Sequence, residues 1–293
     1  MNHAGSPPPV QLAARPADGH KGTFGTVLIV GGCDEGRSMM VGGPAFAAIG
    51  SLRAGAGRAQ MLVPRTLAAS CLSVAPSATA WSHDGDPDKS VELMRDVLPT
   101  CQSLVIGPGL GTGPTAVALV KAAVSATCPV IIDADALNIM AREPRLLEEV
   151  GSQVVLTPHP GEYQRLAEGL SLNPSPRSDQ ERSEAARSIS SKSGAVTVLK
   201  GHRTVVSDGD QIWICDRGSV ALATAGTGDV LSGILGGLSA RTDLELSLFD
   251  RVRLSVWIHA VAGERWAATH GDGGLLAMEL AAEVPQVISS LET

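Results

Sequence analysis

The sequence predicts a single α/β domain built on a largely parallel sheet. Short runs of β-branched and aliphatic residues recur along the 293-residue chain and alternate with longer small-residue or amphipathic segments. The runs are apolar throughout, as expected of strands that are buried on both faces of a parallel sheet. Neither an internal repeat nor a linker divides the sequence, so one core is the expected arrangement.

Six strands are expected from these runs. They cover residues 26–30, 59–63, 104–106, 130–132, 154–156 and 196–199. A small antiparallel hairpin should follow the last of them, because the strand-like segments 204–207 and 211–215 flank the turn sequence Asp208-Gly209-Asp210.

Two helices can be placed from capping and periodicity. Ser178 and Glu181 have the spacing of a capping box, which predicts a helix from there to about Ser193. From Asp229 onward, apolar residues recur at helical spacing up to Leu238, so a second helix should begin near Asp229.

Composition excludes several classes of protein. The net charge is -7 and no Lys/Arg run is present, which argues against nucleic-acid binding through phosphate contacts. The longest uncharged stretch, residues 97–120, contains four glycines and three prolines, so it should not span a membrane. Five cysteines without CxxC spacing fit free thiols in a reducing cytoplasm.

The N-terminal residues lack the basic start and the apolar run of a secretory signal. We expect residues 1–19 to form a flexible tail and residues 20–293 to form the domain.

Polar motifs follow directly after the predicted strands. They are Gly31-Gly32, the glycine-rich stretch 107–111, Asp133 with Asp135, residues 157–162 and residues 200–204. The carboxyl ends of parallel strands meet at one edge of a sheet, where ligands bind in a shared crevice. The sequence therefore predicts one site that all five loops form.

The sequence Gly226-Thr227-Gly228-Asp229 opens the second predicted helix. Glycines let backbone N–H groups turn toward a ligand, and the helix dipole adds positive charge, so this segment predicts an anion hole for a phosphoryl group. A carboxylate would repel a bound phosphate, which favours Asp229 as a general base. The alternative is that Asp229 is only the helix N-cap.

The other polar motifs each allow a functional and a structural interpretation. The 200–204 turn offers two cations and a hydroxyl to a nucleotide, or is a solvated basic turn. One carboxylate of Asp133 and Asp135 could orient Mg²⁺ through water, or cap a helix. His159, between two prolines, could donate a hydrogen bond to substrate or be structural. Cys33 is expected to serve packing.

Taken in order, the motifs resemble the NAD(P)H-hydrate dehydratase family from about residue 20 to about residue 288. The segments that carry the resemblance are HKGTFG (20–25), GPGLG (107–111), DADALN (133–138), TPHPGE (157–162), KGHRT (200–204) and GTGD (226–229). The last is common to many ribokinase-like kinases, whereas the HKGTFG, DADALN and TPHPGE segments are specific to the dehydratases. The resemblance implies a ribokinase-like three-layer α/β/α fold.

The resemblance also implies a reaction: ADP or ATP, with Mg²⁺, phosphorylates the ring hydroxyl of NADHX or NADPHX, and phosphate then leaves to restore NADH or NADPH. It implies catalytic roles for Gly226, Thr227, Gly228 and Asp229, and substrate contacts at Gly43, Gly109, Gly111, His159 and Asp229. The nucleotide contacts implied are Lys200, Gly201, His202, Arg203, Thr204 and Gly228. No protein-held metal ligands are implied. A cytoplasmic homotetramer without the epimerase domain of some relatives is expected.

Two rival functions share part of this pattern. A ribokinase-like kinase for a vitamin-precursor alcohol would use the same anion hole and aspartate but release a stable phosphate ester. A nucleotide sensor or a Rossmann dehydrogenase is suggested by Gly31-Gly32, but the GxGxxG spacing is missing. The region about 20 positions later also holds Arg53 and Arg58 in place of an acidic residue.

Overall fold

In the computed structural model, which describes residues 5–36 and 38–292, nine strands form one sheet in the order β11-β10-β9-β8-β7-β6-β1-β4-β5. The strands are β1 (Thr26–Val30), β4 (Arg58–Pro64), β5 (Thr79–His83), β6 (Ser103–Ile106), β7 (Val130–Ile132), β8 (Val154–Leu156), β9 (Val196–Leu199), β10 (Val205–Ser207) and β11 (Ile212–Ile214). Neighbours from β5 to β9 pair in parallel, whereas β10 and β11 are antiparallel. The expected α/β class and the six predicted strands are confirmed.

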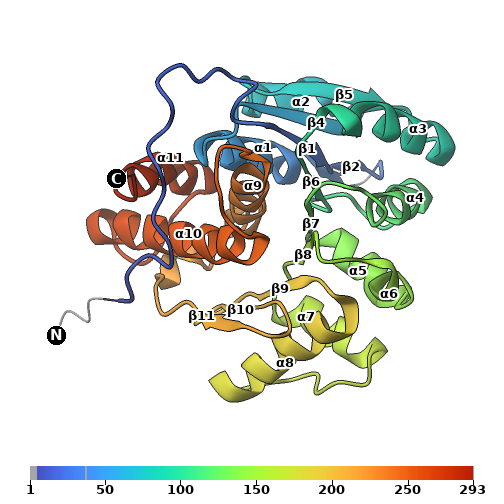
Figure 1. Ribbon diagram of the computed structural model, residues 1–293. Helices are drawn as coiled ribbons and strands as arrows, with labels where there is room; N and C mark the ends of the chain where they lie inside the picture. The colour runs from blue at the N-terminus through green and yellow to red at the C-terminus, as the bar shows by residue number, and fades with distance from the viewer. Residues whose placement is uncertain (1–4, 37, 293) are drawn as a thin grey trace.

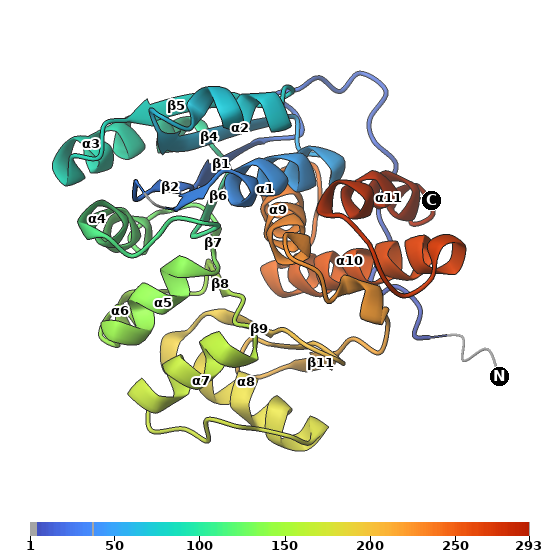
Figure 2. The ribbon, with the colours of Figure 1, turned by 180° about the vertical axis from the view of Figure 1, so that it is seen from behind.

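Helices cover both faces of the sheet, as Figure 1 and, from behind, Figure 2 show. One layer contains α3 (Pro87–Val97), α4 (Pro114–Ala123), α5 (Asp135–Arg142), α6 (Leu146–Glu149), α7 (Pro160–Gly169) and α8 (Asp179–Ser193). The other contains α1 (Gly42–Arg53), α2 (Ala68–Val74), α9 (Thr227–Ala240) and α10 (Leu248–His270), with α11 (Ala277–Ser289) packed outside it. The alternation along β1 explains the layers, because Leu28 packs into the first core and Val27 into the second.

The two helices and the hairpin predicted from local sequence patterns are present close to the predicted positions. Ser178 Oγ accepts a hydrogen bond from the Glu181 N–H at 3.2 Å, and the Glu181 carboxylate accepts one from the Ser178 N–H at 2.9 Å. This capping box opens α8, which ends at Ser193 as predicted. The helix expected near Asp229 is α9, which begins two residues earlier, and β10 and β11 form the expected hairpin.

Strand β5 was not predicted. It lies at the edge of the sheet and alternates in burial, with Trp81 44% exposed, so it lacks the continuous apolar run of the central strands. A two-residue pair, β2 (Cys33–Asp34) with β3 (Met39–Met40), was also missed because it is too short to show any periodicity.

The segment 5–19 lies against the domain and is anchored at two places. Leu12 is buried, and its N–H donates to the Leu291 carbonyl at 3.1 Å. The Ser6 N–H donates to the Asp216 carboxylate at 3.1 Å, and its carbonyl accepts from the Trp257 indole at 3.1 Å. Figure 1 shows this segment crossing α10 and α11. A domain boundary at residue 20 stays a prediction, and residues 1–4 of the expected tail lie outside the described residues.

Two further expectations concern the whole chain. The five cysteines are free thiols, and three of them, Cys71, Cys101 and Cys215, are buried. Within the described residues, no helix has both the length and the apolar character that crossing a bilayer would require.

Helices α1 and α9 approach each other at backbone distance. A Cβ atom on Gly233 would lie 2.2 Å from the Ala47 carbonyl oxygen, and one on Gly50 would lie 2.6 Å from that of Val230. Only glycine tolerates such contacts, because any side chain would have to push the helices apart. This packing holds the N-termini of both helices at the carboxyl edge of the sheet.

Replacing Gly233 by alanine should therefore destabilise the fold. We expect Gly233→Ala to lower the free energy of unfolding by about 2 kcal/mol or more, since the backbone atoms that meet the new methyl group cannot rotate away. Urea denaturation at pH 7 measures the loss. Gly151→Ala, with open space around its Cβ position, is the matched control and should change stability by less than about 0.5 kcal/mol. Equal stability of the two variants would contradict the packing argument.

Candidate active site

Three strand-end residues and one helix residue meet in a single hydrogen-bonded cluster. Asp133 follows β7, Thr157 follows β8, Lys200 follows β9 and Ser232 lies on α9. Asp133 Oδ1 accepts from Lys200 Nζ at 2.6 Å and from Thr157 Oγ1 at 2.7 Å, while Oδ2 accepts from Ser232 Oγ at 2.6 Å. Three of the five predicted loops therefore converge, and α9 contributes the fourth member of the cluster through Ser232.

The cluster is a buried ion pair with additional hydrogen bonds. Asp133 is 2% exposed and the Lys200 side chain 17%. Burial alone would raise the pKa of Asp133, but the charge of Lys200 and the hydrogen bonds outweigh it and hold that pKa below its usual range. Burial likewise opposes the charge of Lys200, yet Asp133 and Glu162 raise the pKa of its amine. Both groups stay ionised at neutral pH, so Lys200 is not part of a solvated basic turn.

Asp229 lies on the first turn of α9, partly buried, next to this ion pair. Burial is the main cause that raises the pKa of Asp229 to about 7, and the nearby Asp133 carboxylate adds to it, against the opposing effect of Lys200. A carboxyl group that titrates near neutral pH is matched to accepting a proton from a substrate. A Cβ atom on the neighbouring Gly228 would lie 3.8 Å from Lys200 Nζ, so the GTGD and KGHRT segments face one another.

The N-terminus of α9 has the geometry of an anion hole. Its N-cap is Gly226, in the left-handed region at φ 88°, and no side chain of the described residues caps the helix. The interpretation of Asp229 as the N-cap is therefore wrong, because Asp229 is the third helical residue. First-turn amides without a side-chain cap, together with the helix dipole, favour a bound phosphoryl group.

Thr227 has a supporting position in this loop. Its hydroxyl donates to the carbonyl oxygens of Leu222 and Thr224, each at 2.8 Å, which fixes the turn before α9. The Thr227 carbonyl accepts from His259 Nε2 on α10 at 2.9 Å. Burial lowers the pKa of His259 to about 4, so this ring is neutral at pH 7. Sequence reasoning missed His259 because no local motif surrounds it.

His159 caps α7 with its own side chain. Its Nδ1 accepts from the N–H of Gly161 at 3.0 Å and from that of Glu162 at 3.4 Å, and the Glu162 carboxylate accepts from the His159 N–H at 2.8 Å. Burial, with Lys200 and Arg165, lowers the pKa of His159, so the ring is neutral with its proton on Nε2. The structural interpretation is confirmed for Nδ1, while a substrate contact by the half-exposed ring stays a prediction.

Glu162 was not singled out by the sequence. Its side chain is 5% exposed and lies 3.9 Å from Lys200 Nζ. Burial raises the pKa of Glu162 to about 7, with the Asp133 charge adding to the effect and Lys200 opposing it. The cleft therefore holds two carboxyl groups, those of Glu162 and Asp229, that titrate near neutral pH.

The glycine loop after β6 brings Gly43, Gly109 and Gly111 together, three of the five residues predicted to contact substrate. Gly109 and Gly111 have φ angles of 61° and 72°, and the Gly111 N–H donates to Asp135 Oδ2 at 2.9 Å. A Cβ atom on Gly43 would lie 2.7 Å from the carbonyl carbon of Pro108, so the N-terminus of α1 rests on this loop. Asp135 does not cap α5, whose N-cap is Ala134, and neither does Asp133.

Gly31 and the KGHRT turn are the two remaining predicted loops. A Cβ atom on Gly31 would lie 2.3 Å from the Pro108 carbonyl oxygen, so this glycine serves loop packing. In the KGHRT turn, Gly201 has φ 139°, the Thr204 hydroxyl donates to the Gly201 carbonyl at 3.0 Å, and Arg203 Nε lies 2.8 Å from Asp179. His202 is exposed. The turn directs Lys200 inward, leaves Gly201 and His202 exposed, and holds Arg203 and Thr204 partly buried.

Comparison with known proteins identifies close relatives over nearly the whole chain. A model of the NAD(P)H-hydrate dehydratase family matches residues 27–286. The ADP-dependent (S)-NAD(P)H-hydrate dehydratase of Bacillus subtilis is 34% identical over 284 residues, covering 96% of this chain and 95% of the relative. The bifunctional NAD(P)H-hydrate repair enzyme Nnr of Coxiella burnetii is 36% identical over 271 residues, covering 92% of this chain but 51% of that enzyme. The chain thus spans about half the length of its bifunctional relatives.

Solved structures agree on the fold. The crystal structure of the ADP/ATP-dependent NAD(P)H-hydrate dehydratase from Bacillus subtilis, co-crystallized with ATP and Mg²⁺, matches with a TM-score of 0.78 and 30% identity, covering 96% of this chain and 95% of that one. A ribokinase from Giardia lamblia matches with a TM-score of 0.59 at 12% identity, covering 91% and 98%, and shows the fold alone. The predicted ribokinase-like fold is confirmed.

Removing one charge of the buried pair should be costly. Asp133→Asn removes the nearer counter-charge of the buried Lys200 ammonium and leaves only Glu162, 3.9 Å away, so we expect a loss of about 3 kcal/mol in the free energy of unfolding at pH 7. Asp135→Asn, two residues away, is the control and should cost about 1 kcal/mol, because it removes no buried counter-charge. Urea denaturation gives both values. A similar loss in the two variants would show that the pair does not anchor the site.

The raised pKa of Asp229 makes a pH-dependent prediction. Because folding raises this pKa from 3.8 to about 7, the folded chain holds the proton more tightly, and stability falls as the pH rises from about 4 to about 7. Asp229→Asn is neutral at every pH, so it should be more stable than the wild type by about 4 kcal/mol at pH 8.5, where the shift of about three pKa units is fully expressed, and nearly equally stable at pH 4. Exposed Asp272→Asn should show no such pH-dependent gain in the same denaturation series.

Proposed function

We propose, because the chain belongs to the NAD(P)H-hydrate dehydratase family, that it is a carbon–oxygen lyase that repairs damaged nicotinamide cofactors. Its substrates are (6S)-NADHX and NADPHX, in which water has added to the nicotinamide ring, and its products are NADH and NADPH. The observation that carries the proposal is the Asp229 carboxyl group, which titrates near neutral pH on the uncapped first turn of α9 and next to Lys200.

The first step is phosphoryl transfer to the ring hydroxyl. Asp229 accepts the hydroxyl proton as the oxygen attacks the terminal phosphorus of ADP or ATP, and the bond from that phosphorus to the nucleotide breaks. Amides of the Gly226 to Gly228 segment, including that of Thr227, stabilise the charge on the transferring group. These donors are fixed by α9 before substrate arrives, so no reorganisation opposes the step.

The second step is elimination. Hydroxide is a poor leaving group, whereas phosphate leaves readily when the ring nitrogen donates its electron pair to the carbon that loses the oxygen. A proton then leaves the neighbouring ring carbon, and the double bond of NADH or NADPH forms. The overall change is loss of water from the substrate, with the nucleotide hydrolysed to release phosphate.

The nucleotide site we propose consists of Gly228 and the 200–204 turn, that is Lys200, Gly201, His202, Arg203 and Thr204. Lys200 supplies a fixed charge for phosphates, and the turn presents exposed polar groups to the remainder of the nucleotide. ADP or ATP is the phosphoryl donor, in keeping with the ADP-dependent and the ADP/ATP-dependent relatives from Bacillus subtilis.

Magnesium fits this site as an ion that the phosphates hold. Among the described residues, no group of three or more His, Cys, Asp or Glu could hold a metal. Asp133 is paired with the Lys200 ammonium, whereas Asp135 accepts hydrogen bonds from two neutral donors, the Gly111 N–H and the Asn138 side chain, so Asp135 is the carboxylate that we propose acts on the ion through water. Magnesium normally keeps its waters and binds phosphates with few protein ligands, and it would neutralise phosphate charge here.

The substrate site we propose is formed by Gly43, Gly109, Gly111, His159 and Asp229. The close approach of α1 to the glycine loop supports it, because backbone groups without side chains can contact a flat ring. A kinase that releases a stable phosphate ester would share the catalytic aspartate, but the family match favours the dehydratase.

Location and assembly complete the proposal. Free cysteines, including three buried ones, suit the reducing cytoplasm. A homotetramer is proposed from the family resemblance, and the exposed apolar side chains of Val220, Leu276 and Met278 offer surface for subunit contacts.

Activity is tested by following NADH at 340 nm. With ADP or ATP, Mg²⁺ and (6S)-NADHX, the chain should regenerate NADH in a nucleotide-dependent way, and Asp229→Asn should lower kcat by roughly 10²–10⁴ because the base is lost. Nucleotide binding by calorimetry should persist in the variant, and Asp272→Asn should retain full activity. No NADH above the nucleotide-free control would reject the dehydratase, whereas lost nucleotide binding would assign Asp229 a structural role.

A further inference from the structure

A cavity of about 480 Å³ opens at the carboxyl edge of the sheet, and none of the residues given a role in the proposed function lines it. Its walls come from the segment after β1, the ends of β4 and β5, and the start of α4. The volume lies within the range of small-molecule sites. In the strand order, β4 and β5 lie on the opposite side of β6 from β7, β8 and β9, which carry the Lys200 cluster.

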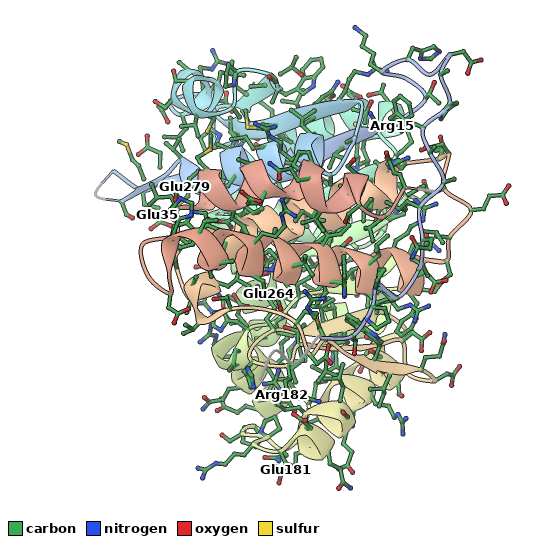
Figure 3. All side chains as sticks on the ribbon, turned by 90° about the vertical axis from the view of Figure 1, so that its left-hand side faces the viewer. Arg15, Glu35, Glu181, Arg182, Glu264 and Glu279 are labelled. Carbon is green, nitrogen blue, oxygen red and sulfur yellow. The ribbon has the colours of Figure 1, made fainter. Side chains whose placement is uncertain are left out.

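The cavity continues from the glycine loop. Leu110, in the middle of that loop, lines it. Glu35, on another wall, has its Oε1 atom 3.0 Å from the position of a Cβ on Gly111. Figure 3 shows Glu35 at the left edge of the view and Arg182, which donates to the Lys200 carbonyl, lower in the molecule. The glycine loop therefore joins the substrate contacts proposed at Gly109 and Gly111 to this cavity.

The geometry of phosphoryl transfer indicates the direction in which the substrate extends from the reacting phosphorus. In phosphoryl transfer the attacking and leaving oxygens lie on opposite sides of the phosphorus. If the donor nucleotide occupies the Lys200 side, the remainder of the substrate extends away from it, toward β1 and β4. Three strand spacings separate β7 from β4, or about 14 Å at about 4.8 Å each, a distance that an extended dinucleotide can bridge.

His83 gives the cavity a neutral donor. It is 9% exposed, and its Nδ1 accepts from the Gly85 N–H at 3.3 Å, so the ring proton is on Nε2. Burial lowers the pKa of His83, and the ring is neutral at pH 7. Across residues 5–36 and 38–292, no acceptor is bonded to Nε2. A buried flat ring with a free N–H suits a nucleoside, which offers an aromatic base and several acceptors.

The charges of the lining oppose an additional phosphate. Three carboxylates, those of Asp34, Glu35 and Asp84, face one described cation, Arg65. A hydrogen bond from Thr66 lowers the pKa of Asp34, and one from the Asp86 N–H lowers the pKa of Asp84, so both are ionised. Carboxylates accept hydrogen bonds from ribose hydroxyls, and this is how dinucleotide sites select a ribose without a 2′-phosphate.

We propose that this cavity receives the adenosine end of the dinucleotide hydrate and favours NADHX over NADPHX. The inference rests on the proposed function and adds which of the two substrates the same site prefers. The wild-type chain should show a kcat/KM for NADHX about five- to tenfold above that for NADPHX at low salt, because a 2′-phosphate meets three carboxylates against one cation among the described lining residues. The ratio should shrink as salt is added.

Gly113→Phe tests occupancy of the cavity. Gly113 lines it, has an ordinary φ of -72°, and has open space around its Cβ position, so a phenyl ring can fill the cavity without backbone strain. We expect the KM for NADHX to rise at least tenfold with kcat nearly unchanged. The hydrate of reduced nicotinamide mononucleotide, which lacks the adenylate, should react equally well with variant and wild type. Gly151 is an exposed glycine outside the cavity with open space around its Cβ position. Gly151→Phe should therefore leave the KM unchanged for NADHX and for the mononucleotide hydrate.

The outcomes separate the two levels of the argument. Normal turnover with an unchanged KM for NADHX in Gly113→Phe would overturn the cavity assignment and leave the proposed function standing. An equal rise in KM for NADHX and for the hydrate of reduced nicotinamide mononucleotide would also overturn it, since the effect would not depend on the adenylate. If the wild type regenerates neither NADH nor reduced nicotinamide mononucleotide, the function fails and the cavity proposal falls with it.

Asp84→Asn tests the selectivity separately. The substitution removes one exposed carboxylate with little change of shape, and the KM for NADPHX should fall about fivefold while that for NADHX changes by less than twofold. Asp88→Asn, an exposed residue of α3 that does not line the cavity, is the control and should leave both KM values unchanged. A wild type that prefers NADPHX, or an Asp84→Asn variant with an unaltered ratio, would overturn the charge argument.

Discussion

The buried pair between Lys200 and Asp133 is the interaction on which the site depends. Two ions leave water, which is favourable only when each finds a counter-charge and hydrogen bonds. Here Thr157 and Ser232 satisfy the carboxylate, and the pair joins the ends of three strands to α9. The same charges act on Asp229. Burial and the Asp133 carboxylate raise the pKa of Asp229, and the Lys200 charge opposes them. One cluster thus affects both the shape of the cleft and the proton affinity of the carboxyl group that we propose as the base.

Backbone, more than side-chain bulk, forms the remainder of the site. Aromatic residues make up only 3% of the chain, and glycines let helices and loops meet at main-chain distance. Gly233 sets the approach of α9 to α1, and Gly43 sets that of α1 to the glycine loop. The N-termini of α1 and α9 therefore lie at the carboxyl edge of the sheet, and the first-turn amides of α9, which no side chain of the described residues caps, can contact a phosphate. Rigid donors of this kind are the arrangement that stabilises transferring charge.

The crevice has two ends with different chemistry. At the β7–β9 end, Lys200 and the turn after it offer positive charge and exposed polar groups. At the β4–β5 end, carboxylates and the neutral His83 line a cavity. Asp229 and the glycine loop lie between these ends. Such a division suits a reaction that brings together a phosphoryl donor and a long acceptor, because each partner enters from its own side.

The sequence alone determined the features that depend on neighbouring residues. Continuous apolar runs defined the six buried strands, the Ser178–Glu181 spacing defined a capped helix, and the position of each motif after a strand defined the sheet edge that holds the site. These signals are local, because burial on both faces and capping each leave a pattern within a few residues. The edge strand β5 left no such pattern.

Tertiary structure alone decided which groups meet. Ser232 bonds Asp133 across 99 residues, and Lys200 reaches it across 67. Glu162 and His259 acquire perturbed pKa values from burial that no local motif records. Whether Asp229 caps its helix or lies inside the first turn depended on the φ angle of Gly226. Contacts and burial depend on how distant segments pack, and that packing is a property of the whole fold.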